Sequence, residues 1–116
     1  MVDDDDTFRA LVSAILGETA DVVEQAAEGA AAVALARGLH PDVVVMDISM
    51  PGMNGIDAAS TISRENPGAR IVFLSGTETE AKLAAASDGG TYAVIHKSAN
   101  DLRAELLAAV RGSLAD

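Results

Sequence analysis

The sequence predicts an α/β fold in which five strands alternate with five helices, as a (βα)5 doubly wound parallel sheet. Three short apolar runs are continuous rather than alternating, which is typical of parallel strands covered by helices on both faces. Segments with apolar residues at helical spacing fill the gaps between these runs. Hydrophobic residues make up 49% of the chain but aromatic residues only 3%, so the core is expected to consist of small aliphatic side chains. Strands that alternate with helices predict right-handed crossovers and a single parallel sheet.

The strands differ in how clearly the sequence marks them. The strongest are short, rich in β-branched residues and apolar throughout, whereas the first is only a two-residue trace and the second is interrupted by charges. In chain order, the predicted strands are 1–2, 20–25, 43–46, 70–74 and 92–95.

The helices are predicted from apolar stripes and from the residues that stop them. Gly17 is expected to stop the first helix, Gly38 and Pro41 the second, and Asn66-Pro67-Gly68 the third. Asn100 or Ser98 is the expected N-cap of the last helix. The predicted helical segments are 8–15, 32–36, 56–62, 78–88 and 102–110.

Length and composition limit what the chain can be. Its 116 residues fit one domain spanning 1–116, and the absence of cysteine excludes disulfides and thiolate metal sites. A net charge of −10 argues against binding nucleic acid directly. No apolar stretch approaches the roughly 18 residues of a membrane span, so a cytoplasmic protein is expected. Four of the first six residues are aspartate, and such a run by itself is usually a solvated tail.

Polar residues follow the predicted strands at one edge of the sheet, where open parallel sheets place their sites. Asp3 and Asp4 follow the first strand, Asp47 the third, Ser75 the fourth and Lys97 the fifth. Crowded carboxylates need a cation, and oxygen ligands without His or Cys favour a hard ion such as Mg²⁺. Asp47 is the best nucleophile because it ends the strongest strand, and Ser75 is placed to hydrogen-bond a transferred phosphoryl group. Each residue alone has an ordinary structural explanation, but the joint pattern predicts phosphoryl transfer.

The same residues resemble the response-regulator receiver domain over almost the whole chain. The motif D-x-x-M-P-G-M-N-G at 47–55 is the most specific part of the resemblance, which also includes the segments 2–4 and 74–76. The resemblance implies a flavodoxin-like, CheY-like strand order 2-1-3-4-5 with a shortened first strand. It also implies that Asp47 is the phosphoacceptor, Ser75 the switch hydroxyl and Lys97 the phosphate-binding lysine.

The resemblance further implies a Mg²⁺ site and a set of partners. Asp4 would be a direct ligand and Asp3 a water-mediated one, joined by Asp47 and the backbone carbonyl of Ser49. A sensor histidine kinase would supply the phosphoryl group. The segments 78–88, 92–95 and 102–110 would contact an output domain or a partner protein.

Further expectations concern activity and context. Direct contact with nucleic acid or a membrane is not expected. Beyond accepting phosphoryl from small donors and losing it again, no enzymatic activity is expected. Residues 5–9 and 97–99 look most like receivers that precede a LuxR-type helix-turn-helix output domain.

The first strand departs from this pattern because only Met1 and Val2 precede the acidic pair, where about five buried residues are expected. Marginal stability, weak Mg²⁺ binding or a homodimer that repairs the sheet is therefore expected. An alternative function is a phosphorylation-independent interaction module with an impaired metal site. An aspartyl-phosphate phosphohydrolase is disfavoured because position 49 is Ser rather than a second Asp. Neither His40 nor His96 lies in a catalytic pattern.

Overall fold

The computed structural model describes residues 1–2, 5–17, 26–48, 50, 54–86, 91–98 and 100–115. These ranges form an α/β fold, which confirms the predicted class, and the predicted strand 20–25 lies outside them. No helix in the described part of the chain is long and apolar enough to cross a membrane. The elements are α1 (Asp6–Leu16), α2 (Gly29–Leu39), β1 (Val43–Asp47), α3 (Gly55–Glu65), β2 (Arg70–Ser75), α4 (Glu78–Ala86), β3 (Thr91–His96) and α5 (Leu102–Ala115).

In the described part of the chain, three parallel strands form a sheet in the order β1-β2-β3, and two single residues, Val2 and Ala26, extend it beyond β1. Isolated parallel bridges join Val2 to Ala26 on one side and to Met46 on the other. The Val2 N–H donates to the Val45 carbonyl at 2.8 Å, and the Val2 carbonyl accepts from the Asp47 N–H at 2.8 Å. The lateral order is Ala26, Val2, β1, β2, β3. Ala26 directly follows the predicted second strand, Val2 belongs to the predicted first, and β1, β2 and β3 are the predicted third, fourth and fifth. This arrangement agrees with the order 2-1-3-4-5.

The predicted shortening of the first strand agrees with this arrangement. Among the described residues, Val2 alone forms the bridges on that side of β1. Val2 is nevertheless 4% exposed and belongs to the core, so the short segment is held by packing as well as by hydrogen bonds. Marginal stability and dimer formation stay predictions.

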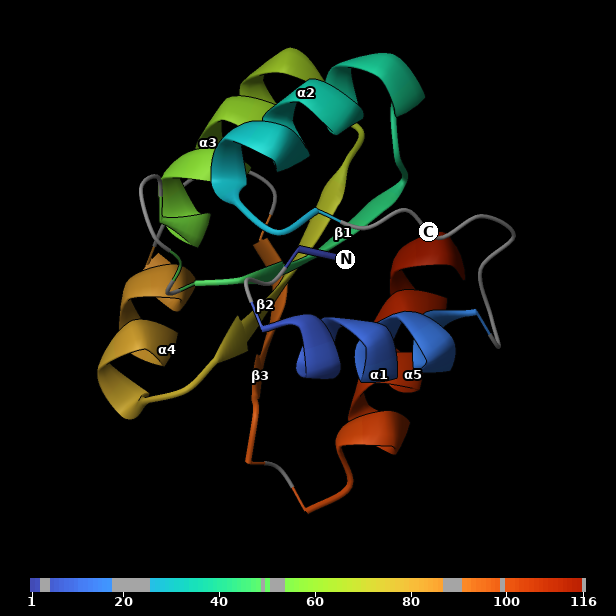
Figure 1. The fold of residues 1–116 in the computed structure, drawn as a ribbon, viewed down its shortest axis with the longest axis vertical. Coiled ribbons are helices and arrows are strands. Elements are labelled where there is room, and N and C mark those ends of the chain that lie inside the picture. Colours follow the sequence, from blue (N-terminus) through green and yellow to red (C-terminus); the bar gives the residue numbers. More distant parts are fainter. Residues whose placement is uncertain are drawn as a thin grey trace.

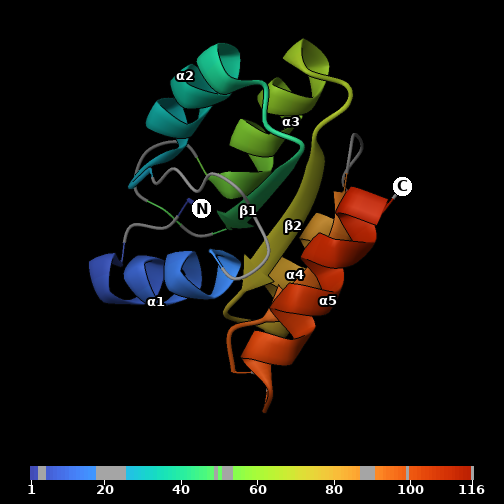
Figure 2. The same cartoon turned by 90° about the vertical axis from the view of Figure 1, so that its right-hand side faces the viewer.

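Helices cover both faces of the sheet (Figures 1 and 2). On one face, α2 and α3 pack over Met46 and Phe73, which are almost completely buried. On the other face, α1 and α5 pack over Val45 and Leu74. Since successive side chains of a strand point to opposite faces, the uninterrupted apolar runs supply both cores at once. The remaining helix, α4, lies against β2 and β3.

An ion pair joins the outer surfaces of α2 and α3. The Arg37 guanidinium approaches the Glu65 carboxylate with three N···O distances between 2.7 and 3.0 Å. Hydrogen bonding to Arg37 lowers the pKa of Glu65, and the same contact raises the pKa of Arg37. The pair therefore couples the packing of these two helices to the ionisation of a surface carboxylate.

Two of the four aspartates at the start of the chain, Asp5 and Asp6, make specific contacts at the beginning of α1. Asp5 is the N-cap of α1, and its Oδ1 accepts the N–H of Phe8 at 3.1 Å. Asp6 accepts from Arg9 at 2.6 Å within the first turn. A carboxylate suits this position because the first N–H groups of a helix lack backbone partners and carry positive partial charge.

Two helix ends differ from the predictions. Gly38 lies inside α2, and His40 takes the left-handed cap with φ 48°. The cap conformation is needed one residue beyond the last helical residue, and His adopts it more readily than most non-glycine residues. At α5 the N-cap role falls to Asp101, not to Asn100 or Ser98, because the Asp101 Oδ1 accepts a first-turn N–H at 3.1 Å.

Candidate functional site

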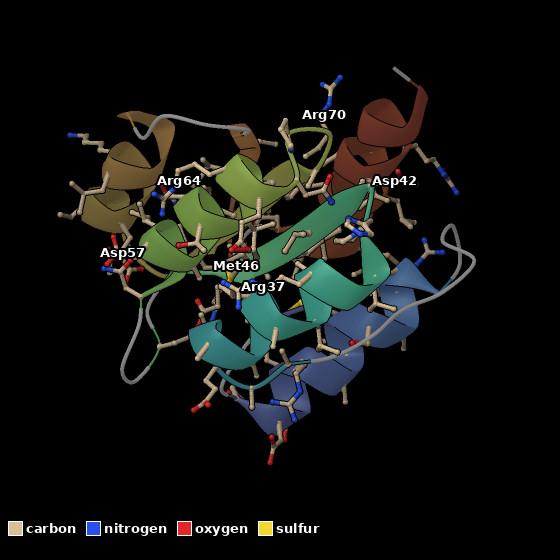
Figure 3. The ribbon with its side chains drawn as sticks, turned by 90° about the horizontal axis from the view of Figure 1, so that it is seen from above. Arg37, Asp42, Met46, Asp57, Arg64 and Arg70 are labelled. Atoms are coloured by element: carbon tan, nitrogen blue, oxygen red, sulfur yellow. The ribbon has the colours of Figure 1, made fainter. Side chains whose placement is uncertain are left out.

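The site lies at the carboxyl ends of the strands. Asp42 and Arg70 mark the opposite end, where the Arg70 N–H donates to the Asp42 carbonyl at 2.9 Å. Figure 3 shows these two residues far across the molecule from Asp57, in the first turn of α3. Helix α3 starts from the carboxyl end of β1, so the end that carries Asp57 is also the end that carries the predicted site.

An ion pair between a buried carboxylate and a partly exposed ammonium forms the centre of this edge. Asp47 is the last residue of β1 and is 3% exposed. The Lys97 Nζ lies 2.9 Å from the Asp47 Oδ1. The Lys97 backbone N–H donates to the Ser75 carbonyl at 2.8 Å. This bond prolongs the pairing of β2 with β3 and fixes the backbone from which the lysine side chain extends. Burying a carboxylate away from water costs free energy unless a cation pairs with it, and here Lys97 is that cation.

Ser75 ends β2 and is 1% exposed, but its hydroxyl faces the following loop. Its Oγ donates to the Thr77 carbonyl and accepts the Thr77 N–H at 3.3 Å. The Glu80 carboxylate accepts the Gly76 N–H at 3.0 Å, and the Glu80 N–H donates to the Thr77 Oγ at 3.1 Å. The hydroxyl is therefore part of a hydrogen-bonded turn that leads into α4.

Steric crowding explains why the 47–55 motif ends in a glycine. The Gly55 N–H donates to the Ile48 carbonyl at 2.7 Å. A Cβ at Gly55 would lie 2.0 Å from the backbone oxygen of Asp47, which no side chain tolerates. Asn54 caps α3 by accepting the Asp57 N–H at 2.9 Å. The turn signal Asn-Gly is thus also a close approach of α3 to the backbone that carries the candidate nucleophile.

Three of the predicted Mg²⁺ donors, Asp3, Asp4 and Ser49, lie outside the described residues, as do residues 51–53 of the motif. Within the described ranges, no three His, Cys, Asp or Glu side chains cluster as a metal site would. Asp47 is the predicted donor that lies within the described residues, and its carboxylate oxygens suit a hard cation. The Asp47 N–H donates to the carbonyl of Val2, the residue directly before the acidic pair. Oxygen-donor chemistry of this kind suits Mg²⁺.

Phe8 belongs to the site's surroundings, although the sequence pattern placed it only in the apolar stripe of the first helix. The Lys97 Nζ lies 4.9 Å from the centroid of the Phe8 ring. The signal that could have found it is the N-cap Asp5, which sets the first turn of α1 directly after the acidic pair.

Of the two histidines, His96 lies at the same edge of the sheet as the site, and His40 lies at the end of α2. The His96 Nε2 lies 3.6 Å from the Glu78 Oε1, where the end of β3 meets the start of α4. His40 caps the carboxyl end of α2, next to the start of β1.

The chain belongs to the response regulator receiver domain family, whose sequence profile matches residues 1–111. It is 35% identical over 97 residues to the chemotaxis protein CheY of Halobacterium salinarum, covering 84% of this chain and 81% of that protein. It is 38% identical over 105 residues to protein-glutamate methylesterase/protein-glutamine glutaminase 1 of Vibrio cholerae. That match covers 88% of this chain but only 28% of the longer relative.

Solved structures agree with this membership. A two-component response regulator of the LuxR family from Aurantimonas sp. matches with a TM-score of 0.81 and 30% identity, over 98% of this chain and 81% of that one. The CheX–CheY–BeF3–Mg complex from Borrelia burgdorferi matches with a TM-score of 0.77 and 29% identity, over 99% and 87%. The resemblance to receivers, including LuxR-type receivers, is therefore confirmed, and the chain is a receiver domain of two-component signalling.

Proposed function

We propose that Asp47 is the residue of this receiver domain that accepts the phosphoryl group. The observation that carries the proposal is the buried Asp47 carboxylate at the carboxyl end of β1, 2.9 Å from the Lys97 ammonium. A carboxylate oxygen attacks the phosphorus atom of the donor. The bond between phosphorus and the donor's leaving group breaks, and an aspartyl phosphate forms.

Lys97 contributes electrostatically. Before transfer, its ammonium neutralises the Asp47 carboxylate. After transfer, the ammonium pairs with the anionic oxygens of the phosphoryl group on Asp47. The Lys97 side chain is 27% exposed, so its ammonium has room to shift from the carboxylate to the phosphoryl group. Asp47, by contrast, is fixed in the core at the end of a strand. The pair therefore supplies a fixed nucleophile and an adjustable cation.

Mg²⁺ is the cofactor that we propose for the site, held by the carboxylates of Asp3, Asp4 and Asp47 and by the backbone carbonyl of Ser49. When bound, it supplies positive charge to the carboxylates and to the phosphoryl oxygens. Oxygen-only donor chemistry supports this assignment, and so does the Mg-containing CheY complex among the structural neighbours.

We assign the switch to Ser75. For its hydroxyl to hydrogen-bond a phosphoryl group on Asp47, it has to leave the Thr77 carbonyl, which changes the turn that leads into α4. The output surface that we propose is formed by α4, β3 and α5, and Leu83 on α4 is 58% exposed there. The partners would be a sensor histidine kinase and an output domain or partner protein, and the LuxR-family neighbour supports a transcriptional output.

The test is phosphorylation by a small donor. The chain is incubated with acetyl phosphate and MgCl₂, and uptake is measured by intact mass spectrometry. One phosphoryl group is expected on the wild type and on Asp42→Asn, which changes an exposed carboxylate at the other end of β1. None is expected on Asp47→Asn, and EDTA should abolish uptake by the wild type.

Two results would contradict the proposal. Undiminished uptake by Asp47→Asn would place the phosphoryl group elsewhere. No uptake by the wild type in saturating Mg²⁺ would favour a phosphorylation-independent interaction module.

A further inference from the structure

The aromatic ring of Phe8 lies beside the ammonium of the site lysine. The Lys97 Nζ is 4.9 Å from the ring centroid and 2.9 Å from the Asp47 Oδ1. The ammonium therefore contacts a carboxylate from β1 and an aromatic face from α1. Both contacts involve a side chain that is only 27% exposed.

The ring is itself held in place by the start of α1. The Phe8 N–H donates to the Asp5 Oδ1 of the N-cap, which fixes the first turn of the helix. The Phe8 side chain is half-buried and packs against the apolar cluster between the sheet and the helices α1 and α5. The ring is thus anchored by local capping and by the core, independently of the lysine.

We propose that Phe8 is a positioning residue that keeps the Lys97 ammonium directed at Asp47. The proposal rests on the function proposed above and adds a residue to it. An aromatic face attracts a cation but accepts no strong hydrogen bond, so it restricts the lysine without competing for its donors. The ammonium can then transfer its hydrogen bonds from the carboxylate to a phosphoryl group while it stays over the ring. A leucine at the same position would fill the space but leave the lysine free to turn towards water.

The contact can be tested by NMR before any phosphorylation. The chain contains two lysines, Lys97 and the exposed Lys82 on α4, so a ¹³C-lysine-labelled sample has two ε-methylene signals. The ring current of Phe8 should move the Lys97 signal upfield of the Lys82 signal. Phe8→Leu should remove the difference, and Phe8→Tyr should keep it.

The consequence can be tested by initial rates of phosphorylation from acetyl phosphate in Mg²⁺. Phe8→Leu should slow the rate about threefold to tenfold, which is the range expected for a partly exposed cation–π contact. Phe8→Tyr should restore the rate to within about twofold, since the ring face is kept. Leu11→Ala, on the exposed face of the same helix, is the matched control and should leave the rate unchanged. Thermal melts verify that each variant is folded at the assay temperature.

The outcomes separate the two proposals. A Phe8→Leu protein that is folded and reacts at the wild-type rate overturns the positioning role. So does a Phe8→Tyr protein that is as slow as Phe8→Leu. If the wild type takes up no phosphoryl group, the proposed function fails, and the NMR comparison alone decides whether the ring positions the ammonium.

Discussion

The unequal burial of Asp47 and Lys97 predicts an asymmetric response to mutation. Lys97→Met removes the ammonium and keeps an unbranched apolar stem, which leaves the Asp47 carboxylate on a side chain that is 4% exposed. Two unit charges 2.9 Å apart attract each other by about 6 kcal/mol at an effective dielectric constant of about 20. Because the lysine is partly exposed and solvent screens the pair, the expected net loss is smaller, about 2–4 kcal/mol of unfolding free energy.

The reverse change should be mild. In Asp47→Asn, the lysine keeps its access to water and a neutral amide replaces the charge, so the expected change is below about 1 kcal/mol. When Lys97→Met is combined with Asp47→Asn, it should likewise lower stability by less than about 1 kcal/mol, since no buried carboxylate is left behind. The two substitutions should therefore be strongly non-additive.

Urea unfolding followed by circular dichroism, in buffer without divalent cations, measures all four corners of this cycle. Lys82→Met, on the exposed surface of α4, is the control and should change stability by less than about 0.5 kcal/mol. If Lys97→Met alone fails to fold, the double variant should still fold. The predicted asymmetry is refuted if Lys97→Met is as stable as the wild type, or if it costs the same with and without Asp47→Asn.

Three further predictions concern the scaffold. Gly55→Ala should lower the unfolding free energy by about 3 kcal/mol, because the new Cβ would meet the backbone of β1. Gly38→Ala is the control in the same urea assay. Its Cβ would lie in open space on α2, so it should raise the unfolding free energy by about 0.5–1 kcal/mol. Equal effects of the two would contradict the close approach. Asp5→Ala should lower stability by about 1 kcal/mol through loss of the α1 cap, and an unchanged denaturation midpoint would show that the cap is dispensable. Glu65→Gln should reduce the melting temperature near neutral pH but not in acid. The folded-state pKa of Glu65 is lowered from 4.5, so the contribution of the pair is present above that value and is lost as pH falls through the folded pKa. A melting difference that does not shrink as the pH falls from neutral into the acid range would exclude the pair as its cause.

Much of the fold could be predicted because local patterns determine it. The continuous apolar run before Asp47 needs helices on both faces, and the structure places a helix pair on each face of β1. The carboxyl ends of parallel strands meet at one edge, so the parallel direction of the strands predicts that Asp47 and Lys97, 50 residues apart in the sequence, lie at the same edge.

The remainder depends on tertiary contacts that no local pattern encodes. A two-residue trace does not reveal that Val2 bonds β1 through both its N–H and its carbonyl. Periodicity places Phe8 in a helix stripe but does not indicate that its ring faces the lysine that follows β3. The sequence predicts that the Ser75 hydroxyl hydrogen-bonds a transferred phosphoryl group. It does not indicate that the hydroxyl donates to the Thr77 carbonyl, which depends on the folded loop.

The central claim is that Asp47 carries the phosphoryl group. The most direct test treats the acetyl-phosphate-modified chain with borohydride, which reduces an aspartyl phosphate to homoserine, and locates the product by peptide sequencing in a mass spectrometer. Homoserine is expected at position 47, with unmodified aspartate at Asp42. Homoserine at any other position, or none at 47 in a chain that has gained phosphoryl mass, would contradict the claim.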